Sequence, residues 1–466
     1  MEKRRSFLKN IALTGLFGSF GSFASAKSHE ETLLERISAP RPASGKSVIG
    51  LTVAPIPQVK VAVVGLGNRG TFLTQLVDAL CPGKATLTAI CDVRKEQVEK
   101  TLKNLKDSGH GQKPAVYHSD PEGWKEMMRR DDIDLVIIAT PWDLHVPMCV
   151  YGMQNGKHVA TEVPAAYTLE GCWQLVDTAE ETQRNCMMLE NVCYGDEELW
   201  LLNMVADGVF GTLTYAEAAY IHDLKESLFS EDGYYNQWRI RHHVAHDGNL
   251  YPTHGLGPVA QYMGIDRGDR FETLVSMSSK QASLSEYSQT VDKKNEFYGR
   301  KEFAHGDMNN VMIKTANGRM ILVQHDVVTP RPYNRINLLS GTKGCHEGYP
   351  SRLSHIDHGH GHEWMDEKTY NQYREKYKHP IWDKLKTEIE KNGGHGGMDF
   401  LEFYRLIDCL NQGRPLDMDV YDAASWSVVT PLSEISVQLG NIPVRFPDFT
   451  RGRWKENRTL GMLKYI

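Results

Sequence analysis

The sequence contains no Cys-x-x-Cys pair, although 8 cysteines are scattered along its 466 residues. It has no strong excess of charge of either sign, because 53 Lys and Arg stand against 59 Asp and Glu, a net charge of −6 with the 19 His counted as neutral. Proteins that bind nucleic acid usually carry a basic patch, so this balance argues against a nucleic-acid partner. Beyond residue 26 no apolar run is long enough to span a membrane, and we expect no stable membrane insertion.

The N-terminus is basic and then apolar. Paired arginines stand in Arg4-Arg5-Ser6-Phe7-Leu8-Lys9, and an apolar stretch leads to Ala24-Ser25-Ala26. This pattern predicts that residues 1–26 are a twin-arginine signal peptide, with the twin-arginine export machinery as partner and a periplasmic or cell-surface location. A short membrane anchor or a cytosolic amphipathic tail is the alternative. Because such chains fold in a reducing compartment before export, we expect mostly reduced, buried cysteines.

The rest of the chain, about 440 residues, is too long for one core, so we expect two domains. Residues 27–57 show little periodicity and are interpreted as a tether. Residues 58–192 alternate apolar strands with helices, which predicts a Rossmann domain with a doubly wound parallel sheet. Residues 193–466 carry longer strands, and Asn317-Gly318 between two of them favours a hairpin. We therefore expect a second α+β domain with an open, mostly antiparallel sheet and a poorly periodic, His-rich insertion at 341–397.

The expected elements follow from these patterns. Strands are expected at 59–64, 85–91, 135–139, 158–160, 187–189, 212–221, 272–278, 309–315, 320–328 and 334–339. Helices are expected at 72–80, 95–105, 146–155, 169–184, 398–410 and 421–439.

A glycine fingerprint follows the first predicted strand. The sequence from Val61 to Gly70 is VAVVGLGNRG, and its three glycines are Gly65, Gly67 and Gly70. Such glycines permit a tight turn, a close approach of the backbone to a pyrophosphate and close packing of helix on strand. Asp92 ends the next strand, where a carboxylate accepts hydrogen bonds from ribose hydroxyls and disfavours a 2′-phosphate. The pattern predicts NAD, with nearby Arg94 as a mild counter-signal; a Gly turn that has lost its ligand is the alternative.

The loop after the third predicted strand is a further candidate. It reads Ala139-Thr140-Pro141-Trp142-Asp143-Leu144-His145, at the end of a strand where a cofactor crevice lies. A proline turn with Trp142 as a packing residue is the alternative. A nicotinamide protein outside the cytoplasm has no supply of fresh cofactor, so we expect tightly bound NAD in a closed or unusually recharged redox cycle.

Taken together, these residues resemble the glucose–fructose oxidoreductase and inositol dehydrogenase superfamily over nearly all of the chain after residue 57. In that superfamily a Glu-Lys-Pro triplet ends the strand after the nicotinamide loop, and its Lys takes part in proton transfer. This chain has Glu162-Val163-Pro164, and Val163 cannot move a proton. The departure puts ordinary alcohol dehydrogenation by the usual residues in doubt.

A more specific resemblance is to glycoside hydrolase family 109, the NAD-dependent α-N-acetylgalactosaminidases. Five separated motifs occur in order: Glu190-Asn191-Val192-Cys193-Tyr194, Tyr220-Ile221-His222-Asp223-Leu224, Trp238-Arg239, Gly248-Asn249-Leu250-Tyr251-Pro252-Thr253-His254-Gly255 and Pro330-Arg331-Pro332-Tyr333-Asn334. The twin-arginine start fits as well. The implied substrate is terminal α-linked N-acetylgalactosamine on a glycan or glycoconjugate.

The resemblance also implies which residues form the site. The implied contacts to NAD are Gly65, Gly67, Asn68, Arg69, Gly70, Asp92, Trp142, Asp143, Leu144, His145, Glu162, Val163, Asn191 and Tyr251. The implied sugar pocket consists of Tyr220, Arg239, Tyr251, Pro252, Thr253, His254 and Tyr333.

The family's chemistry differs from the two-carboxylate route of most glycosidases. Hydride leaves C3 of the sugar for NAD, the resulting ketone acidifies the C2 proton, the aglycone is eliminated from C1, water adds, and hydride returns. One bound NAD then serves many turnovers, which matches the closed cycle expected from the export signal.

The catalytic candidates are His254, Tyr220 and His222. A histidine suits the base that takes the 3-hydroxyl proton, and we assign His254; a buried histidine at a helix start is the alternative. Tyr220 and His222 alternate along a strand and share one face, so the pair is assigned to the C2 proton without separate roles; an aromatic pair that only packs is the alternative. Arg239 would hold the acetamide or a ring hydroxyl, or else form a surface ion pair. Tyr333 would shape a loop or only pack.

The insertion holds a second cluster, His355, His358, His360 and His362 beside Asp357 and Glu363. Such clustering binds Zn or Ni in some proteins, but no spacing here matches a closed site, so we expect no metal. His395, in Gly393-Gly394-His395-Gly396-Gly397, is an alternative sugar contact. Rival functions are a net sugar oxidoreductase, a non-catalytic sugar-binding protein and a glycosidase for another sugar. Association into a homo-oligomer is implied by analogy with the superfamily.

Overall fold

The computed structural model describes residues 29–358 and 361–464. The signal peptide predicted for residues 1–26 lies outside these ranges. Within them, no helix has both the length and the apolar character that crossing a membrane requires.

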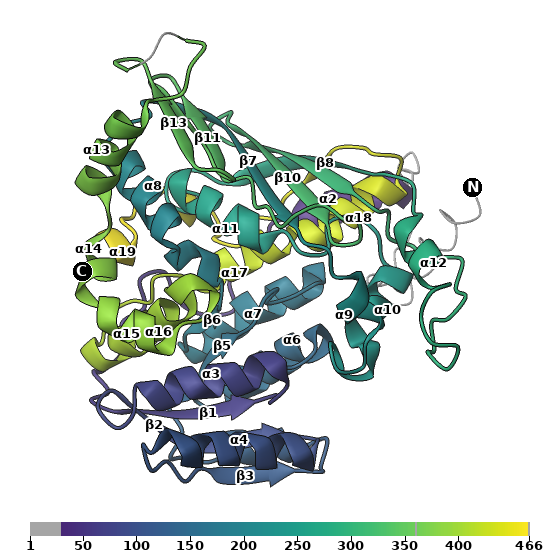
Figure 1. Cartoon of the computed structure of the whole chain (residues 1–466), viewed down its shortest axis with the longest axis vertical. Coiled ribbons are helices and arrows are strands. Elements are labelled where there is room, and N and C mark those ends of the chain that lie inside the picture. The colour runs from purple at the N-terminus through teal and green to yellow at the C-terminus, as the bar shows by residue number, and fades with distance from the viewer. Residues whose placement is uncertain (1–28, 359–360, 465–466) are drawn as a thin grey trace.

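The first half of the chain forms a parallel sheet of six strands in the order β3-β2-β1-β4-β5-β6, the lower layer of Figure 1. Strands β4 and β5 are buried along their whole length, which explains their unbroken apolar sequences. The elements are β1 (Val59–Val64), α3 (Asn68–Ala79), β2 (Ala85–Asp92), α4 (Lys95–Ser108), β3 (Ala115–His118), α5 (Gly123–Met128), β4 (Leu135–Ile138), α6 (Trp142–Gln154), β5 (His158–Thr161), α7 (Leu169–Thr182) and β6 (Cys186–Met188).

The second half forms a sheet of eight strands in the order β13-β12-β11-β7-β10-β9-β8-β14, at the top of Figure 1. Only β7 and β10 run parallel; every other neighbouring pair is antiparallel. The strands are β7 (Leu213–Ile221), β8 (Phe271–Ser278), β9 (Asn309–Thr315), β10 (Met320–Asp326), β11 (Leu338–Gly341), β12 (Gly344–Glu347), β13 (Arg352–His355) and β14 (Val444–Arg445). The fold class predicted for the two halves is therefore confirmed.

Helices fill the space between the two sheets, and further helices lie at the sides of the molecule (Figure 1). Helix α11 packs on β7, α18 packs on β8, and α17 reaches α7 and β6 of the lower layer. The helices and short 3₁₀ turns are η1 (Asn191–Tyr194), α8 (Asp196–Ala206), α9 (Lys225–Phe229), η2 (Tyr235–Gln237), α10 (Trp238–Ala245), α11 (Thr253–Tyr262), α12 (Ser283–Tyr287), α13 (Glu367–Tyr377), α14 (Pro380–Lys384), α15 (Lys386–Asn392), η3 (His395–Gly397), α16 (Met398–Gln412), α17 (Val420–Ser427), α18 (Val429–Gln438), η4 (Arg453–Lys455) and α19 (Gly461–Lys464).

Several local predictions were wrong. The strand expected at 334–339 begins only at Leu338, because Ile336 and Asn337 have φ angles of 63° and 52°, which extended backbone excludes. The segment 341–397, for which only a poorly periodic, His-rich insertion was expected, contains strands β12 and β13 and helices α13 to α15. The single helix expected at 421–439 is two helices, α17 and α18.

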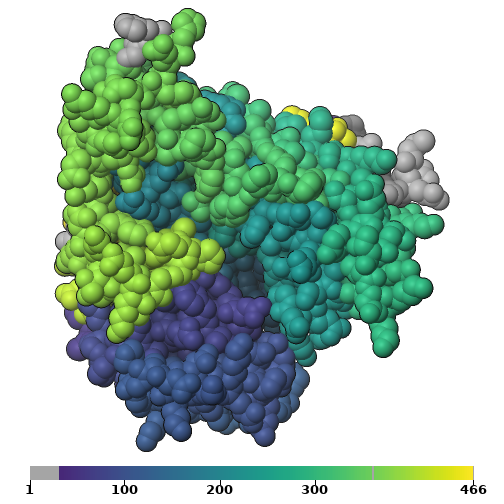
Figure 2. Space-filling view, in the orientation of Figure 1, coloured from purple at the N-terminus to yellow at the C-terminus, as the bar shows by residue number. Residues whose placement is uncertain are grey.

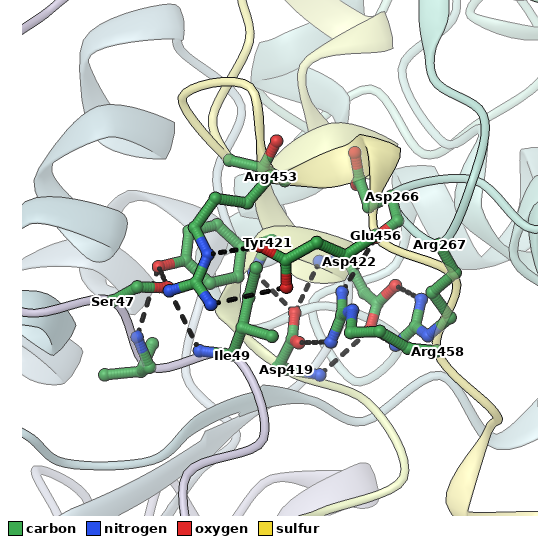
Figure 3. Close-up of polar contacts among 12 residues, drawn as sticks. Ser47, Ile49, Asp266, Arg267, Asp419, Tyr421, Asp422, Arg453, Glu456 and Arg458 are labelled. Carbon is green, nitrogen blue, oxygen red and sulfur yellow. Dashed lines mark hydrogen bonds and ion pairs between the residues drawn. The ribbon is translucent and has the colours of Figure 1, made fainter.

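The N-terminal side of the chain also holds more structure than predicted. The segment interpreted as a tether contains helix α2 (His29–Ser38), whose Leu33 and Ile37 are buried. Further along the same segment, Val48 N donates a hydrogen bond to the Tyr421 hydroxyl at 3.2 Å, and Ser47 Oγ lies 3.0 Å from that hydroxyl. Figure 3 shows this attachment on α17.

A buried charge cluster lies next to that attachment (Figure 3). Arg267 binds both carboxylate oxygens of Asp422 at 2.5 and 2.6 Å, and Arg458 donates to Asp419 at 3.1 Å. Burial raises the pKa of Asp266 from its ordinary value of 3.8 to about 8. We call Asp266, Arg267, Asp419, Asp422 and Arg458 the tail network. It joins the α11–β8 connection and the C-terminal segment to α17.

Candidate active site

The site lies where the strand order of the parallel sheet reverses, between β1 and β4. Strands on either side of such a point lead their connections in opposite directions, which leaves a crevice at their carboxyl ends. A cleft of about 700 Å³ opens here. Figure 2 shows the surface hollowed where the purple segment around α3, the yellow-green segment before α16 and the teal segment around α10 meet.

Most of the predicted site residues line this cleft. They are Gly65, Gly67, Asn68, Arg69, Asp92, Trp142, Leu144, His145, Glu162, Val163, Asn191, Tyr220, Arg239, Tyr251 and His254. Gly70, Asp143, His222, Pro252, Thr253 and Tyr333 do not line it, although His222 and Tyr333 contact residues that do.

The glycine turn forms a cradle that any side chain would fill. Gly65 has a φ of +83°, and a Cβ there would lie 2.6 Å from the Ala139 carbonyl oxygen. A Cβ on Gly70 would lie 1.7 Å from the Gly65 carbonyl oxygen, so the helix start must approach the turn closely. Gly67 caps α3 without a side-chain hydrogen bond, which leaves the first backbone N–H groups of the helix available to an anion. The residues present therefore fit the pyrophosphate of a dinucleotide.

The acidic side chain that was predicted to contact a ribose lies beside the glycine turn and lines the cleft. Asp92 ends β2, and its Oδ2 accepts a hydrogen bond from the backbone of Leu66 at 2.6 Å. Arg94 donates to Asp92 Oδ1 from its backbone at 2.8 Å and from Nε at 3.2 Å. The Arg94 charge is thus directed at the Asp92 carboxylate, and its guanidinium also lies 4.4 Å from the ring centre of Tyr235.

The predicted Trp142–His145 loop is the first turn of α6, not a loop before the helix. Pro141 stands at the N-cap, and Asp143 lies in the first turn, where a negative charge suits the helix dipole. The His145 ring is buried with its two nitrogens 2.8 Å from the carbonyls of Pro164 and Thr140. Asp143 points away from the cleft and accepts a hydrogen bond from Tyr167 at 2.5 Å.

A buried carboxylate that was not predicted from the sequence, Asp399 on α16, links cleft residues that are far apart in the chain. Arg69, in the glycine turn, binds both oxygens of Asp399 at 2.8 and 3.0 Å and Glu162 at 2.6 Å. Asn191 Nδ2 donates to Asp399 at 2.6 Å, and the His395 ring nitrogen Nδ1 lies 2.7 Å from it. We call these five residues the cleft network. Asp399 could have been suspected from the sequence, because it is an acidic residue in the first turn of a helix that follows a glycine run.

The electrostatics of the cleft network hold Asp399 ionised. Burial alone would raise the pKa of Asp399, but hydrogen bonds from His395 and Arg69 hold it well below its usual range. Asn191 Oδ1 is buried and has no hydrogen-bond partner among residues 29–358 and 361–464, so it has an acceptor to offer a ligand.

Aromatic side chains and one arginine form the far end of the cleft. The Arg239 guanidinium on α10 lies 5.1 Å from the ring centre of Trp142 and 4.8 Å from that of Tyr251, and it donates to the Tyr234 hydroxyl at 2.8 Å. Tyr251 and Tyr220 have ring centres 4.7 Å apart. Arg239 is buried among these rings, which excludes the surface ion pair that was its alternative.

His254 lies in the first turn of α11 and bonds to a carboxylate that was not predicted. Its Nδ1 is 2.7 Å from Oε1 of Glu190, which is fully buried. A carboxylate accepts only, so Nδ1 carries the hydrogen and Nε2 is the nitrogen left to exchange a proton. Glu190 thereby orients His254. Glu190 could have been found from the sequence, because it begins the Glu190–Tyr194 motif.

Tyr220 and His222 lie together at the end of β7, as predicted. The Tyr220 hydroxyl is 3.1 Å from His222 Nδ1. Burial raises the pKa of Tyr220, and the Arg239 charge opposes that rise. The pKa of His222 is lowered by burial and by the charges of Arg239, His254 and His395. Tyr333 lies at the rim, with its ring centre 5.2 Å from that of His222.

The His-rich cluster shows no comparable arrangement. The Nε2 of His355 is 3.1 Å from the Val209 carbonyl oxygen. In residues 29–358 and 361–464, no group of three or more His, Cys, Asp or Glu side chains is placed to hold a metal ion. His360 lies outside those ranges. All eight cysteines are free, and only Cys345 is not buried, in agreement with the prediction.

Comparison with known proteins agrees with this geometry. Residues 59–190 match the family model for the oxidoreductase family with an NAD-binding Rossmann fold, and residues 194–456 match that for the C-terminal domain of glycosyl hydrolase 109. The solved structure of a levoglucosan dehydrogenase in complex with NADH superposes with a TM-score of 0.62 at 16% identity, covering 84% of this chain and 100% of that one. Fold and cleft thus define an enzyme of the NAD-binding oxidoreductase class that carries a glycosidase-family domain.

Closer relatives give the family. A glycosyl hydrolase family 109 protein of Shewanella sp. (strain W3-18-1) is 46% identical over 467 residues, covering 99% of this chain and 98% of the relative. Another from Solibacter usitatus is 48% identical over 413 residues, covering 88% and 93%. The chain belongs to glycoside hydrolase family 109.

Proposed function

We propose that this enzyme removes terminal α-linked N-acetylgalactosamine from glycans or glycoconjugates, and that it keeps and recycles a tightly bound NAD. The observation that carries the proposal is that His254, Tyr220 and Arg239 line the same cleft as the glycine cradle. A dinucleotide and a sugar ring placed end to end would fill that cleft.

The cofactor supplies one chemistry: when bound, it accepts a hydride from C3 of the sugar and returns it at the end of the turnover. His254, oriented by Glu190 at 2.7 Å, takes the proton of the 3-hydroxyl group through Nε2. The Tyr220–His222 pair, joined at 3.1 Å, removes the C2 proton once C3 is a ketone. Arg239 donates to the acetamide or a ring hydroxyl. Net redox change is zero.

Val163 supports a division of labour different from that of the dehydrogenases. It lines the cleft at the position where the superfamily pattern has a lysine. An isopropyl group has no proton to give, so proton transfer falls to the His254 and Tyr220 side of the cleft. The placement of two hydrogen-bonded pairs on that side agrees with this division.

The test uses purified enzyme without added cofactor and p-nitrophenyl α-N-acetylgalactosaminide. Nitrophenol and the absorbance of NADH are followed together. Release of nitrophenol over many turnovers without build-up of NADH supports the proposal. Accumulation of NADH without nitrophenol would make the enzyme a net sugar oxidoreductase. If nitrophenol is released only from the glycoside of another α-linked N-acetylhexosamine or hexose, the proposed substrate is wrong but the proposed redox cycle stands.

Export is a separate proposal, supported by the paired arginines and the Ala24-Ser25-Ala26 sequence. The mass of the protein recovered from the periplasm or cell surface should correspond to a chain that starts at Lys27. An uncut N-terminus on that protein would contradict the proposal.

A further inference from the structure

Two exposed tyrosines lie beside each other just outside the cleft. Tyr333 precedes β11, Tyr349 lies in the turn between β12 and β13, and their ring centres are 6.2 Å apart. The two residues are 42% and 38% exposed, and neither lines the cleft itself. Large aromatic rings that are exposed side by side mark a binding surface more often than single exposed rings do. The steps proposed above give neither ring a role.

The first of these tyrosines is tied directly to the end of β7. The backbone N–H and carbonyl of Asn334 bond to the carbonyl and N–H of Ile221, each at 3.0 Å. Ile221 stands between Tyr220 and His222 in the sequence. The ring centre of Tyr333 is 5.2 Å from that of His222. A substrate group that extends from the Tyr220–His222 pair toward solvent on this side therefore passes Tyr333.

The turn that carries Tyr349 is held against the same segment. The Gly348 backbone N–H donates to the Ile336 carbonyl at 2.9 Å, and a Cβ on Gly348 would lie 2.7 Å from that oxygen. The buried His346 ring on β12 has its Nδ1 2.9 Å from the Asn337 carbonyl oxygen. Because these contacts fix the spacing of the two rings before a ligand arrives, binding costs less ordering of side chains.

An arginine joins the two rings to the interior. The Arg335 guanidinium lies 5.7 Å from the ring centre of Tyr333 and 5.6 Å from that of Tyr349, within the range of a cation–π interaction. Its Nη2 donates to the buried Glu198 carboxylate at 2.9 Å, and its Nη1 donates to the Tyr333 hydroxyl at 3.2 Å. Arg335 thus positions both rings from behind and leaves their other faces exposed.

The chemistry of this surface suits a sugar ring better than a peptide. A pyranose has C–H bonds on the face of its ring, which pack on an aromatic face, and hydroxyl groups at its edge, which stay in water. Tyrosine matches this with an apolar ring and a polar tip. An extended peptide would instead need free backbone partners. The backbone of residues 334–336 is already bonded to β7 and to Gly348.

We infer that Tyr333 and Tyr349, positioned by Arg335, form a second sugar subsite. It binds the pyranose ring that is linked to C1 of the N-acetylgalactosamine to be removed. The inference rests on the proposed function, because it names the group on the far side of the bond that is cleaved. The substrate class is then an oligosaccharide end, in which the terminal N-acetylgalactosamine is attached to another sugar ring.

The experiment compares methyl α-N-acetylgalactosaminide, which has no second ring, with the disaccharide N-acetylgalactosaminyl-α-1,3-galactose. The p-nitrophenyl compound is left out because its own aromatic ring would stack on the tyrosines. In Tyr349→Ala the KM for the disaccharide should rise about tenfold while kcat changes little, since a contact remote from the reacting atoms contributes equally to ground state and transition state. The change on the methyl glycoside should be much smaller.

Two further variants serve as controls. Tyr349→Phe keeps the ring and should restore the KM of the unaltered enzyme for the disaccharide. Tyr298→Ala removes a tyrosine that is 40% exposed in the segment between α12 and β9 and that does not line the cleft. This matched control should leave the KM for both substrates unchanged.

The outcomes separate the subsite from the proposed function. An equal loss on both substrates, no loss on the disaccharide, or cleavage of the methyl glycoside but not of the disaccharide by the unaltered enzyme would overturn the inference. A KM that rises for serine-linked α-N-acetylgalactosamine but not for the disaccharide would assign the rings to a peptide and overturn it as well. If the unaltered enzyme releases N-acetylgalactosamine from none of the three substrates, the proposed function fails instead.

Discussion

Two buried charge clusters, the cleft network and the tail network, differ in what their charges face. In the cleft network Arg69, Glu162, Asn191 and His395 all line the cleft, and only Asp399 lies entirely behind it. In the tail network no member lines that cleft, and Arg267 and Asp422 pair with each other in the interior. Both clusters bury carboxylates against arginines.

We interpret the charges of the cleft network as serving ligand binding and those of the tail network as holding the folded chain together. Buried ion pairs contribute little net stability, but leaving one partner alone is costly. In the tail network the pairs fix α17 to the chain segments around it, so their loss should unfold the protein. In the cleft network the charged groups face the cleft, so their loss should first impair the reaction. Variants in each cluster test this division.

The largest effect is expected at the cleft, for His254→Ala. Turnover of p-nitrophenyl α-N-acetylgalactosaminide should fall about 1,000-fold or more, because the base for the 3-hydroxyl proton is gone. The thermal midpoint and the content of bound NAD, measured after denaturation, should stay near those of the unaltered enzyme. His118→Ala, exposed at the end of β3, is the control and should keep its rate. Near-normal turnover in His254→Ala would show that His254 is not the base for the 3-hydroxyl proton.

The next effect is expected in the tail network, for Arg267→Ala. The change leaves the Asp422 carboxylate buried without its bidentate partner, which should cost about 3–5 kcal/mol of folding free energy. Denaturant or thermal unfolding measures the loss, and the remaining folded enzyme should keep its specific activity in the cold. Arg453→Ala breaks the exposed pair with Glu456 and should hardly change stability. Equal behaviour of the two variants would contradict the division.

A third effect, smaller than the preceding ones when it is taken for each pH unit, depends on pH through Asp266. Because burial raises its pKa from 3.8 to about 8, the folded state keeps a proton that the unfolded state has lost between these values. Stability should therefore be fully present below about pH 4 and fall as pH rises toward 8, by at most about 1.4 kcal/mol per pH unit. The groups around Asp266 are Ser425, Asp422, Arg267 and Asp419.

Asp266→Asn removes this titration. The thermal midpoint of the variant, relative to that of the unaltered enzyme, should rise steadily when the two are compared from pH 5 to pH 8. A constant difference across that range would show that Asp266 does not titrate there.

The parallel sheet was predictable because buried parallel strands read as continuous apolar runs. Strand β3 was missed, since it is four residues long and alternates between half-buried and exposed positions at the sheet edge. The start of the 334–339 strand was misplaced because positive φ angles at non-glycine residues leave no periodic signal. Helices α17 and α18 merged into one prediction because both are buried on most sides.

In the site, most of the predicted residues inside recognisable motifs line the cleft, although His222 and Tyr333 do not, and the buried carboxylate partners were missed. Glu190 and Asp399 are carboxylates without periodicity, and their partners lie far away in the chain: 64 residues separate Glu190 from His254 and 330 separate Arg69 from Asp399. No local pattern reports a pairing over such distances. The prediction of Arg69 and Asn191 as cofactor contacts likewise did not foresee that both bind Asp399.

The span between Arg69 and Asp399 also has a meaning for biosynthesis. A ribosome that has finished the glycine turn must add a further 330 residues before the carboxylate that fixes Arg69 exists. N-terminal domains fold while the remainder of a chain is still being made. The parallel sheet can therefore form early, but its dinucleotide turn acquires its final shape among the last events of synthesis. A nascent chain that stops short of α16 lacks Asp399, so it can form the Rossmann fold but not the complete cleft. Binding of the cofactor should therefore distinguish complete chains from truncated ones.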